Sequence, residues 1–390
     1  MPWIDKKCNG DHGRKMIKVI GRRDILDIVS MFLIVQFAGV TIASLVVYTS
    51  TISLIQNGIT SQYTTLLSYI LDAILIVTVS FLFISRHSHH HKALEDSIFF
   101  GVLEAVVVIA TSFFFFLYIF DLLLPRQYIP VAFFGALGCA LLLIAAKDID
   151  PKIRNSVTII SSMGVGLLLG LYFKFEYALI GLAIVAAYDY ISVFVTKSMI
   201  KLARVVTTRN MALIISTAHL EAVPQERFPA KEVREYKDYL YQTHKAKDPA
   251  YWRILSSGRL PVMSQISLGE GDLGLPLMAA VSAYYTFASP VIAIMVIIGA
   301  LAGLLAAIAM LRVYRGALPA IPPLFAFISI FSGFGLAITG NISSYYSVLL
   351  VAAGVAMITF GLSIKIVEKR SRKPAQVRHA AYRAQGGAHR

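Results

Sequence analysis

Long apolar segments alternate with short polar or proline-containing junctions along most of the chain. A run of about 17 to 25 apolar residues is long enough to cross the hydrocarbon core of a bilayer as a helix. Ten such runs are predicted, at 27–48, 63–85, 98–121, 130–146, 156–172, 177–197, 261–286, 290–311, 319–339 and 346–365. The pattern therefore predicts an all-α polytopic membrane protein, a helical bundle with about ten transmembrane helices.

Composition and charge agree with this class. Hydrophobic residues make up 57% of the chain and charged residues 15%, against roughly 25% charged in soluble domains. The net charge of +14 would suit a nucleic-acid partner, but its distribution indicates topology instead. With a cytosolic N-terminus, every basic residue except Arg126 and Lys174 falls on the cytosolic side, as the positive-inside rule requires. We therefore expect both termini in the cytosol, the cell membrane as location, contact with the lipid bilayer, and no nucleic acid.

A long polar loop divides the helices into two groups. The expected organisation is a cytosolic basic N-terminus (1–26), a six-helix part (27–197), a cytosolic loop (198–260), a C-terminal part (261–345), an extra transmembrane helix (346–366) and a disordered basic tail (367–390). Within the loop, residues 199–217 mix apolar and basic positions, which predicts an amphipathic helix in the membrane interface. The rest of the loop predicts a solvated segment.

Two carboxylates interrupt predicted spans, where an ionisable group is costly and indicates function. Asp189 lies about 12 Å from the cytosolic end of the sixth predicted helix, at 1.5 Å per residue. Asp272 lies about 16 Å into the seventh, if that helix begins near Pro261. Antiparallel packing of the two helices would bring the carboxylates together in the cytosolic half of the bilayer.

Paired carboxylates offer a specific chemistry. Like charges a few ångströms apart in an apolar medium cannot both ionise, so the pair shares a proton. The ionised partner can activate a water while the protonated one donates to a carbonyl oxygen, which is peptide hydrolysis without metal or cofactor. Gly269 and Gly271 allow a backbone to approach closely, and Tyr188 can donate a hydrogen bond or wall the site. Prolines in 314–324 mark a third irregular segment at the same membrane face.

Three motifs in this order resemble the presenilin and signal peptide peptidase intramembrane aspartyl proteases, over roughly residues 25–340. They are Tyr-Asp, Gly-x-Gly-Asp and the end of a Pro-Ala-Leu segment, at Tyr188 and Asp189, at Gly269, Gly271 and Asp272, and at Ala317, Leu318 and Pro319. The resemblance implies that the two aspartates are catalytic and that Ala317 to Pro319 shape the site and help hold an unwound substrate strand. It implies transmembrane proteins as substrates, a site opening to the cytosol, and no need for accessory subunits, as in the archaeal stand-alone members.

The chain departs from the family pattern at three places. Glu270 occupies the variable position of Gly-x-Gly-Asp, where apolar residues are commoner; it either assists the chemistry or substrate choice, or faces water at the membrane boundary. Gly316 replaces the proline that opens the third motif, which loosens that loop. The helix at 346–365 has no counterpart in the nine-helix family pattern.

Other functions fit parts of the same pattern. A secondary transporter or channel would use the two carboxylates to relay protons or bind cations, and a catalytically inactive scaffold would keep the fold alone. Asp72 and Glu104 either belong to a proton route or face the bundle with a polar partner. The histidines near residue 90 suit a metal site less well than a solvated loop; they are His87, His89, His90 and His91.

Overall fold

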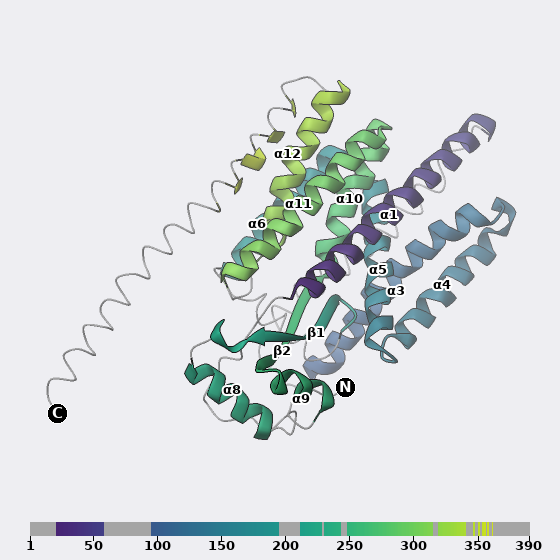
Figure 1. Cartoon of the computed structure of the whole chain (residues 1–390). Coiled ribbons are helices and arrows are strands. Elements are labelled where there is room, and N and C mark those ends of the chain that lie inside the picture. The colour runs from purple at the N-terminus through teal and green to yellow at the C-terminus, as the bar shows by residue number, and fades with distance from the viewer. Residues whose placement is uncertain are drawn as a thin grey trace, which may run out of the picture.

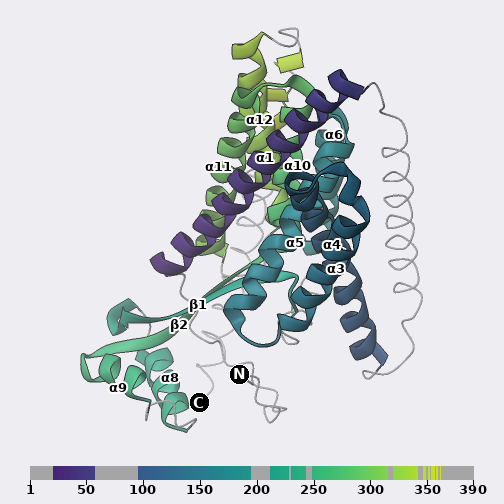
Figure 2. The same cartoon turned by 90° about the vertical axis from the view of Figure 1, so that its right-hand side faces the viewer.

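The computed structural model describes most of the predicted bundle. It covers residues 21–57, 95–194, 211–227, 230–242, 248–314 and 319–340, with single positions between 346 and 361. In this part of the chain the long helices form a bundle, and a two-stranded sheet with short helices extends from one end (Figure 1 and Figure 2). The predicted helix at 63–85, Asp72 and the histidine cluster lie outside the described residues, and the helix at 346–365 lies largely outside them.

The helices of the bundle follow the predicted apolar runs closely. They are α1 (Arg22–Asn57), α3 (Glu95–Leu123), α4 (Ile129–Ala146), α5 (Pro151–Tyr172), α6 (Phe175–Phe194), α10 (Glu270–Phe287), α11 (Pro290–Tyr314) and α12 (Ile321–Thr339), with a short 3-10 turn η1 (Arg126–Tyr128) before α4. Among the described residues, six helices are long and apolar enough to cross a membrane, namely α1, α3, α5, α6, α11 and α12. The chain is thus a multi-span, mostly helical membrane protein, while the count of ten spans stays a prediction.

The polar loop contains a sheet that the sequence did not lead us to expect. Strand β1 (Ile214–Pro224) pairs antiparallel with β2 (Arg259–Gly269), and the register runs from Ile214 opposite Gly269 to Pro224 opposite Arg259. Between the strands lie η2 (Gln225–Arg227), α8 (Ala230–Gln242) and α9 (Pro249–Ser256). The predicted amphipathic helix is therefore wrong from Ile214 onward, and the predicted solvated segment contains two helices.

The seventh predicted helix was placed too early in the chain. A helix from 261 is wrong because residues 259–269 form β2, and α10 begins only at Glu270. Burial along β2 alternates in the period of two that marks a strand, with Met263 and Ser267 exposed between buried neighbours. Those neighbours are Val262, Ser264, Ile266 and Leu268. An apolar strand that runs directly into an apolar helix resembles one long span in sequence.

Helix α10 lies at the centre of the bundle, where it packs against α1, α5, α6 and α11. Leu273, Leu277 and Val281 are completely buried, and so are the alanines between them. Because its neighbours shield it from lipid, α10 can carry polar residues that a lipid-facing helix could not. This explains why α10 is not among the six helices that are long and apolar enough to cross a membrane.

Glycines on the neighbouring helices let α10 approach closely. A Cβ added to Gly39 of α1 would lie 2.5 Å from a methyl carbon of Leu277, and one added to Gly166 of α5 would lie 2.6 Å from the same side chain. A Cβ on Gly170 would lie 2.6 Å from Val281. Small residues at such contacts are how helices pack tightly within membranes, where van der Waals contact replaces the hydrophobic effect.

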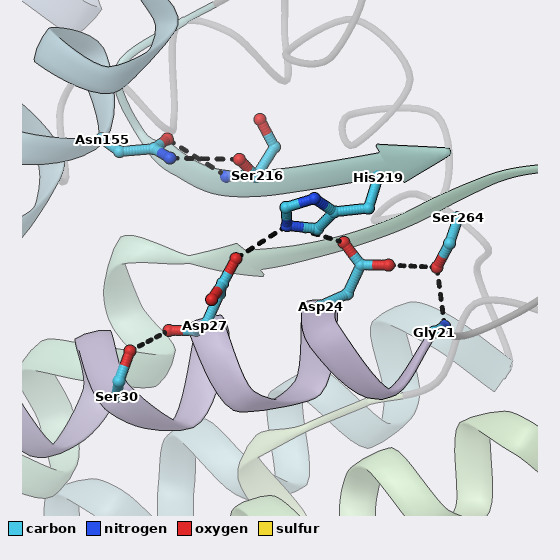
Figure 3. A network of polar contacts seen from close by, with 8 residues as sticks. All are labelled: Gly21, Asp24, Asp27, Ser30, Asn155, Ser216, His219 and Ser264. Atoms are coloured by element: carbon cyan, nitrogen blue, oxygen red, sulfur yellow. Dashed lines mark hydrogen bonds and ion pairs between the residues drawn. The ribbon is translucent and has the colours of Figure 1, made fainter. Parts of the chain in front are cut away.

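A polar network fastens the start of α1 to both strands (Figure 3). The Gly21 N–H donates to Ser264 Oγ over 2.7 Å, and the Ser264 hydroxyl donates to the Asp24 carboxylate. His219 Nε2 lies 2.7 Å from Asp27 Oδ2 and 3.8 Å from Asp24 Oδ1. Helix α1 is therefore joined to β1 through His219 and to β2 through Ser264.

Helix α5 holds the other side of β1. The Asn155 side chain exchanges two hydrogen bonds with the backbone of Ser216, at 3.1 and 3.3 Å. One turn further, the Thr158 hydroxyl donates to the Ala212 carbonyl over 2.9 Å. These bonds satisfy backbone groups at the end of β1 nearest the bundle, which would be costly to bury unpaired.

A buried ion pair completes this attachment. Lys147 Nζ at the end of α4 lies 2.7 Å from Glu104 Oε2 of α3, and the second oxygen of Glu104 accepts the Ala212 N–H over 2.5 Å. The Glu104 side chain is only 3% exposed. The expectation that Glu104 faces the bundle with a polar partner is thus confirmed, and the pair fixes the chain just before β1.

The glycine contacts predict that Gly166→Ala destabilises the bundle, because the added methyl group overlaps Leu277. Overpacking of this kind costs about 1 to 3 kcal/mol, which lowers the apparent Tm in detergent. Gly138→Ala in α4 is the matched control, since a Cβ there meets no described atom within 4 Å and alanine favours helix by about 0.5 to 1 kcal/mol. Equal melting of the two variants would contradict the packing described for α10.

The ion pair predicts that Lys147→Met is strongly destabilising, because it leaves Glu104 buried without its countercharge. The expected loss is about 3 kcal/mol, measured as a fall in apparent Tm. Lys152→Met, at an exposed position of α5, should change little. The double variant Lys147→Met with Glu104→Gln should regain part of the loss; no recovery would show that the charge of Glu104 is not the cause.

Candidate active site

Asp189 lies in α6 and is 6% exposed. Its Oδ2 accepts a hydrogen bond from the backbone N–H of Ile321 over 3.3 Å. Ile321 is the first residue of α12, and it is followed by Pro322 and Pro323, which have no N–H to offer. The carboxylate therefore meets the first available donor of α12, at a helix N-terminus that favours negative charge.

Asp272 occupies the third position of α10, after the N-terminal cap residue Gly269. Its Oδ2 accepts the Gly269 N–H over 3.1 Å, which is the half of a capping box that a glycine cap permits. Like Asp189, this carboxylate thus lies at the positive end of a helix dipole. Each acid is held by one backbone N–H from an irregular segment.

The two carboxylates lie close enough to interact electrostatically. Helix α6, which carries Asp189, packs against both α10 and α12. The structure therefore places the two acids on neighbouring helices within range of each other's charge, although Asp272 stands at the junction of a strand and a helix rather than deep in a helix. Two acids that approach to within a few ångströms can share a proton, and both can then reach one small molecule such as water.

Glu270 belongs to a different environment from Asp272. It is 8% exposed, and its Oε1 accepts a hydrogen bond from the Ser161 hydroxyl of α5. Ser161 Oγ is also 2.5 Å from Thr111 Oγ1 of α3. The expectation that Glu270 faces water at the membrane boundary is wrong, because its side chain enters the bundle between α5 and α3.

The backbone of Glu270 is fixed as well as its side chain. Its N–H donates to the Leu213 carbonyl over 2.9 Å, immediately before β1. Leu213 follows Ala212, which Glu104 and Thr158 hold. The first residue of α10 is thus connected through one short backbone segment to the buried ion pair of α3 and α4.

Gly271 lies on an open side of the site. Its backbone is exposed, and a Cβ built on it would meet no described atom within 4 Å. Gly269 is less open, since a Cβ there would lie 3.3 Å from Asp272 Oδ2. Tyr188 is 60% exposed although it adjoins buried Asp189, so it lies on the outer side of α6 and its role in the site stays a prediction.

Only the end of the third motif can be placed. Pro319 is buried just before α12, next to the segment that donates to Asp189. Gly316, Ala317 and Leu318 lie outside the described residues, so their part in the site stays a prediction. In the described part of the chain, no group of three His, Cys, Asp or Glu side chains is placed to hold a metal ion.

Sequence analysis missed the backbone groups that hold the acids. The Ile321 N–H has no side-chain signal, although the Pro322–Pro323 pair marks the start of a helix, where free N–H groups occur. The sequence gives no signal for the Leu213 carbonyl, because its contact with the Glu270 N–H depends on the pairing of two strands across a long loop. Sequence analysis did not single out Ser161 and Thr111, which are small polar residues within apolar spans.

Comparisons with solved structures, curated sequences and protein families show which proteins the chain resembles. Two solved structures of a presenilin family intramembrane aspartate protease, in space groups C222 and P2, resemble the chain with TM-scores of 0.44 and 0.43 at 18% and 20% sequence identity. Each alignment covers 80% of this chain and 98% of the other. Comparison with curated protein sequences gives no match. The sequence profile described as signal-peptide peptidase, presenilin aspartyl protease matches residues 29–340. The chain therefore belongs to the signal-peptide peptidase and presenilin family of aspartyl proteases, and is an aspartic endopeptidase of that family.

Proposed function

We propose that the protein hydrolyses peptide bonds within transmembrane segments of other membrane proteins, with Asp189 and Asp272 as its catalytic pair. The observation that carries this proposal is the position of the two carboxylates. They lie on packed helices within range of each other's charge, and each accepts a backbone N–H at the start of a helix. A site of this kind stabilises one negative charge in a largely buried setting without a metal ion.

The reaction needs one proton between the two acids. The ionised carboxylate takes a proton from a water molecule as the water oxygen attacks the scissile carbonyl carbon, while the protonated carboxyl donates its proton to the carbonyl oxygen. The tetrahedral diol then collapses: one diol hydroxyl returns its proton to the acid that is now ionised, the C–N bond breaks, and the amine leaves with the proton of the other acid as a new carboxyl group forms. The pair ends with one proton, as it began, so no cofactor is required.

The geometry around the pair supports an extended substrate. A helical substrate hides its peptide bonds in hydrogen bonds, so it must unwind before water can attack. Gly271 leaves space on the side of Asp272 that is open to solvent or lipid. Ala317, Leu318 and Pro319, which lead into α12, are proposed to line the same space and to hold the unwound strand, with Gly316 and Tyr188 at its edges.

Orientation and location follow from charge and connectivity. If the basic residues lie on the cytosolic side, the segment with β1 and β2 is cytosolic. Strand β2 ends at Gly269, three residues before Asp272. The active site then opens to the cytosol, in a protein of the cell membrane with both termini inside. We propose that transmembrane proteins are its substrates and that no accessory subunit is required.

The catalytic assignment predicts that Asp189→Asn and Asp272→Asn each lower cleavage by about 100-fold or more, the range lost with an acid–base group. Asparagine keeps the size of aspartate but cannot take up or release the proton. The measurement is cleavage of a labelled single-span substrate by purified protein in liposomes. Asp148→Asn, at an exposed position of the turn after α4, is the matched control and should cleave as the native chain does.

Two outcomes would contradict the proposal. Cleavage by either active-site variant at the native rate would remove that aspartate from the mechanism. A native chain that cuts none of several single-span substrates would argue against hydrolysis, and proton or cation flux in the same liposomes would then test the transporter alternative.

The open side at Gly271 predicts that Gly271→Leu impairs cleavage without unfolding the protein. The side chain enters space that meets no described atom, so the apparent Tm should stay within a few degrees of native. The leucine side chain should nevertheless compete with the substrate for this space. KM should therefore rise by about tenfold, an effect of about 1.4 kcal/mol on binding. Native KM in this variant would show that substrate approaches Asp272 from another side.

A further inference from the structure

Gln36 is a polar residue in the middle of an apolar span. It lies in α1, is completely buried, and its Nε2 donates to the Leu273 carbonyl of α10 over 3.0 Å. Leu273 directly follows Asp272. A buried amide from another helix therefore holds the backbone beside the proposed catalytic residue.

The backbone at this place needs such support. Pro276 lies inside α10, and a proline has no N–H to donate to the carbonyl four residues earlier, which is that of Asp272. The ring also crowds that carbonyl, so the first turn of α10 has fewer internal bonds than a regular helix. The carbonyl that Gln36 binds is the next one along, at the turn that proline weakens.

The packing of α1 and α10 fixes where the amide lies. Gly39 is one turn beyond Gln36 on the same face of α1, and Leu277 is one turn beyond Leu273 on α10. A Cβ on Gly39 would lie 2.5 Å from Leu277, so two successive turns of α1 meet two successive turns of α10. The close approach at Gly39 sets the distance over which Gln36 reaches its acceptor.

The network at the start of α1 extends the same contact. Asp24 and Gly21 bind Ser264 of β2, about 18 Å along α1 from Gln36 at 1.5 Å per residue. Helix α1 thus holds the chain on both sides of the β2–α10 junction, before Asp272 through Ser264 and after it through Leu273.

Stability alone does not account for an amide at position 36. Its Oε1 is buried and has no hydrogen-bond partner among the described residues, and a buried unsatisfied acceptor costs about 1 to 3 kcal/mol. An apolar side chain of the same length would avoid this cost. Gln36 therefore suits a role in geometry better than a role in folding.

We infer that Gln36 is a positioning residue, which holds the first turn of α10 so that the Asp272 carboxylate faces Asp189. The inference rests on the proposed catalytic role of Asp272. Gln36 touches neither substrate nor the reacting atoms; it acts through the Leu273 carbonyl. Nothing in the family motifs marks this position, which lies in the first predicted span.

The test is Gln36→Met, which keeps the length of the side chain and removes the donor. The expected result is a fall in kcat of about 10- to 100-fold, as for a small misplacement of a catalytic group, with KM within about twofold of native. The apparent Tm should be unchanged or higher. Val35→Ala, a buried apolar truncation on the same helix, is the control and should lower Tm while keeping kcat near native.

A second background separates positioning from general damage. In Pro276→Ala the Asp272 carbonyl regains a helical partner. The fold-loss in kcat that Gln36→Met causes should therefore be at least three times smaller in the Pro276→Ala background than in the native background. The same loss in both backgrounds would overturn the inference. So would native kcat in Gln36→Met, or a fall in its Tm as large as that of Val35→Ala.

Hydrogen exchange tests the structural role of Gln36 separately from the proposed cleavage activity. Backbone amides of residues 272–275 and 277 should exchange about tenfold faster in Gln36→Met than in the native chain, and at the native rate in Val35→Ala. Faster exchange with no cleavage by the native chain would leave the structural role of Gln36 standing and remove the proposed function. Unchanged exchange would overturn the role of Gln36 whatever the activity.

Discussion

The structure depends on the need to compensate two carboxylates inside an apolar bundle. An unpaired charge there is too costly to keep, so each acid requires donors that do not themselves carry a full charge. Asp272 uses the Gly269 N–H and Asp189 uses the Ile321 N–H, both at helix starts where N–H groups are free. A lysine or arginine partner would instead neutralise the acids and remove their use as proton carriers. Backbone donors satisfy the charge while leaving a second oxygen on each acid for chemistry.

This requirement explains why irregular backbone occurs where it does. Within a bundle of helices, free N–H groups occur where helices begin, so the starts of α10 and α12 lie beside the acids rather than at a membrane surface. The strand β2 leads into α10, and the Pro322–Pro323 pair opens α12. Irregular backbone in a membrane protein is tolerated only when protein or water satisfies it. Here the Leu213 carbonyl accepts the Glu270 N–H at the start of α10, and the two acids accept the Gly269 and Ile321 N–H groups.

Sequence analysis predicted the features that depend on composition and local pattern. Apolar length located the described helices of the bundle, and intramembrane acidity located Asp189 and Asp272. Sequence analysis placed the start of the seventh helix wrongly because β2 is apolar enough to resemble the start of a span, and because the partner strand of β2 lies across a long loop. Glu270 was expected either to assist the chemistry or substrate choice, or to face water at the membrane boundary. Its burial depends on Ser161, more than a hundred residues away, which no local pattern reveals.

Gln36 shows the same limit of sequence analysis, although in this case the residue itself is conspicuous in the sequence. A single glutamine in an apolar span is visible in the sequence, yet its meaning depends on which helix it faces and on the proline in that helix. Once α1 lies against α10 through Gly39 and Leu277, the amide has one backbone carbonyl within reach, beside Asp272. The polar contacts of α1 therefore form a series along the β2–α10 junction rather than separate stabilising bonds. A bundle held this way can keep a weak first turn in α10, because the geometry of that turn is set by a neighbouring helix and not by its own hydrogen bonds.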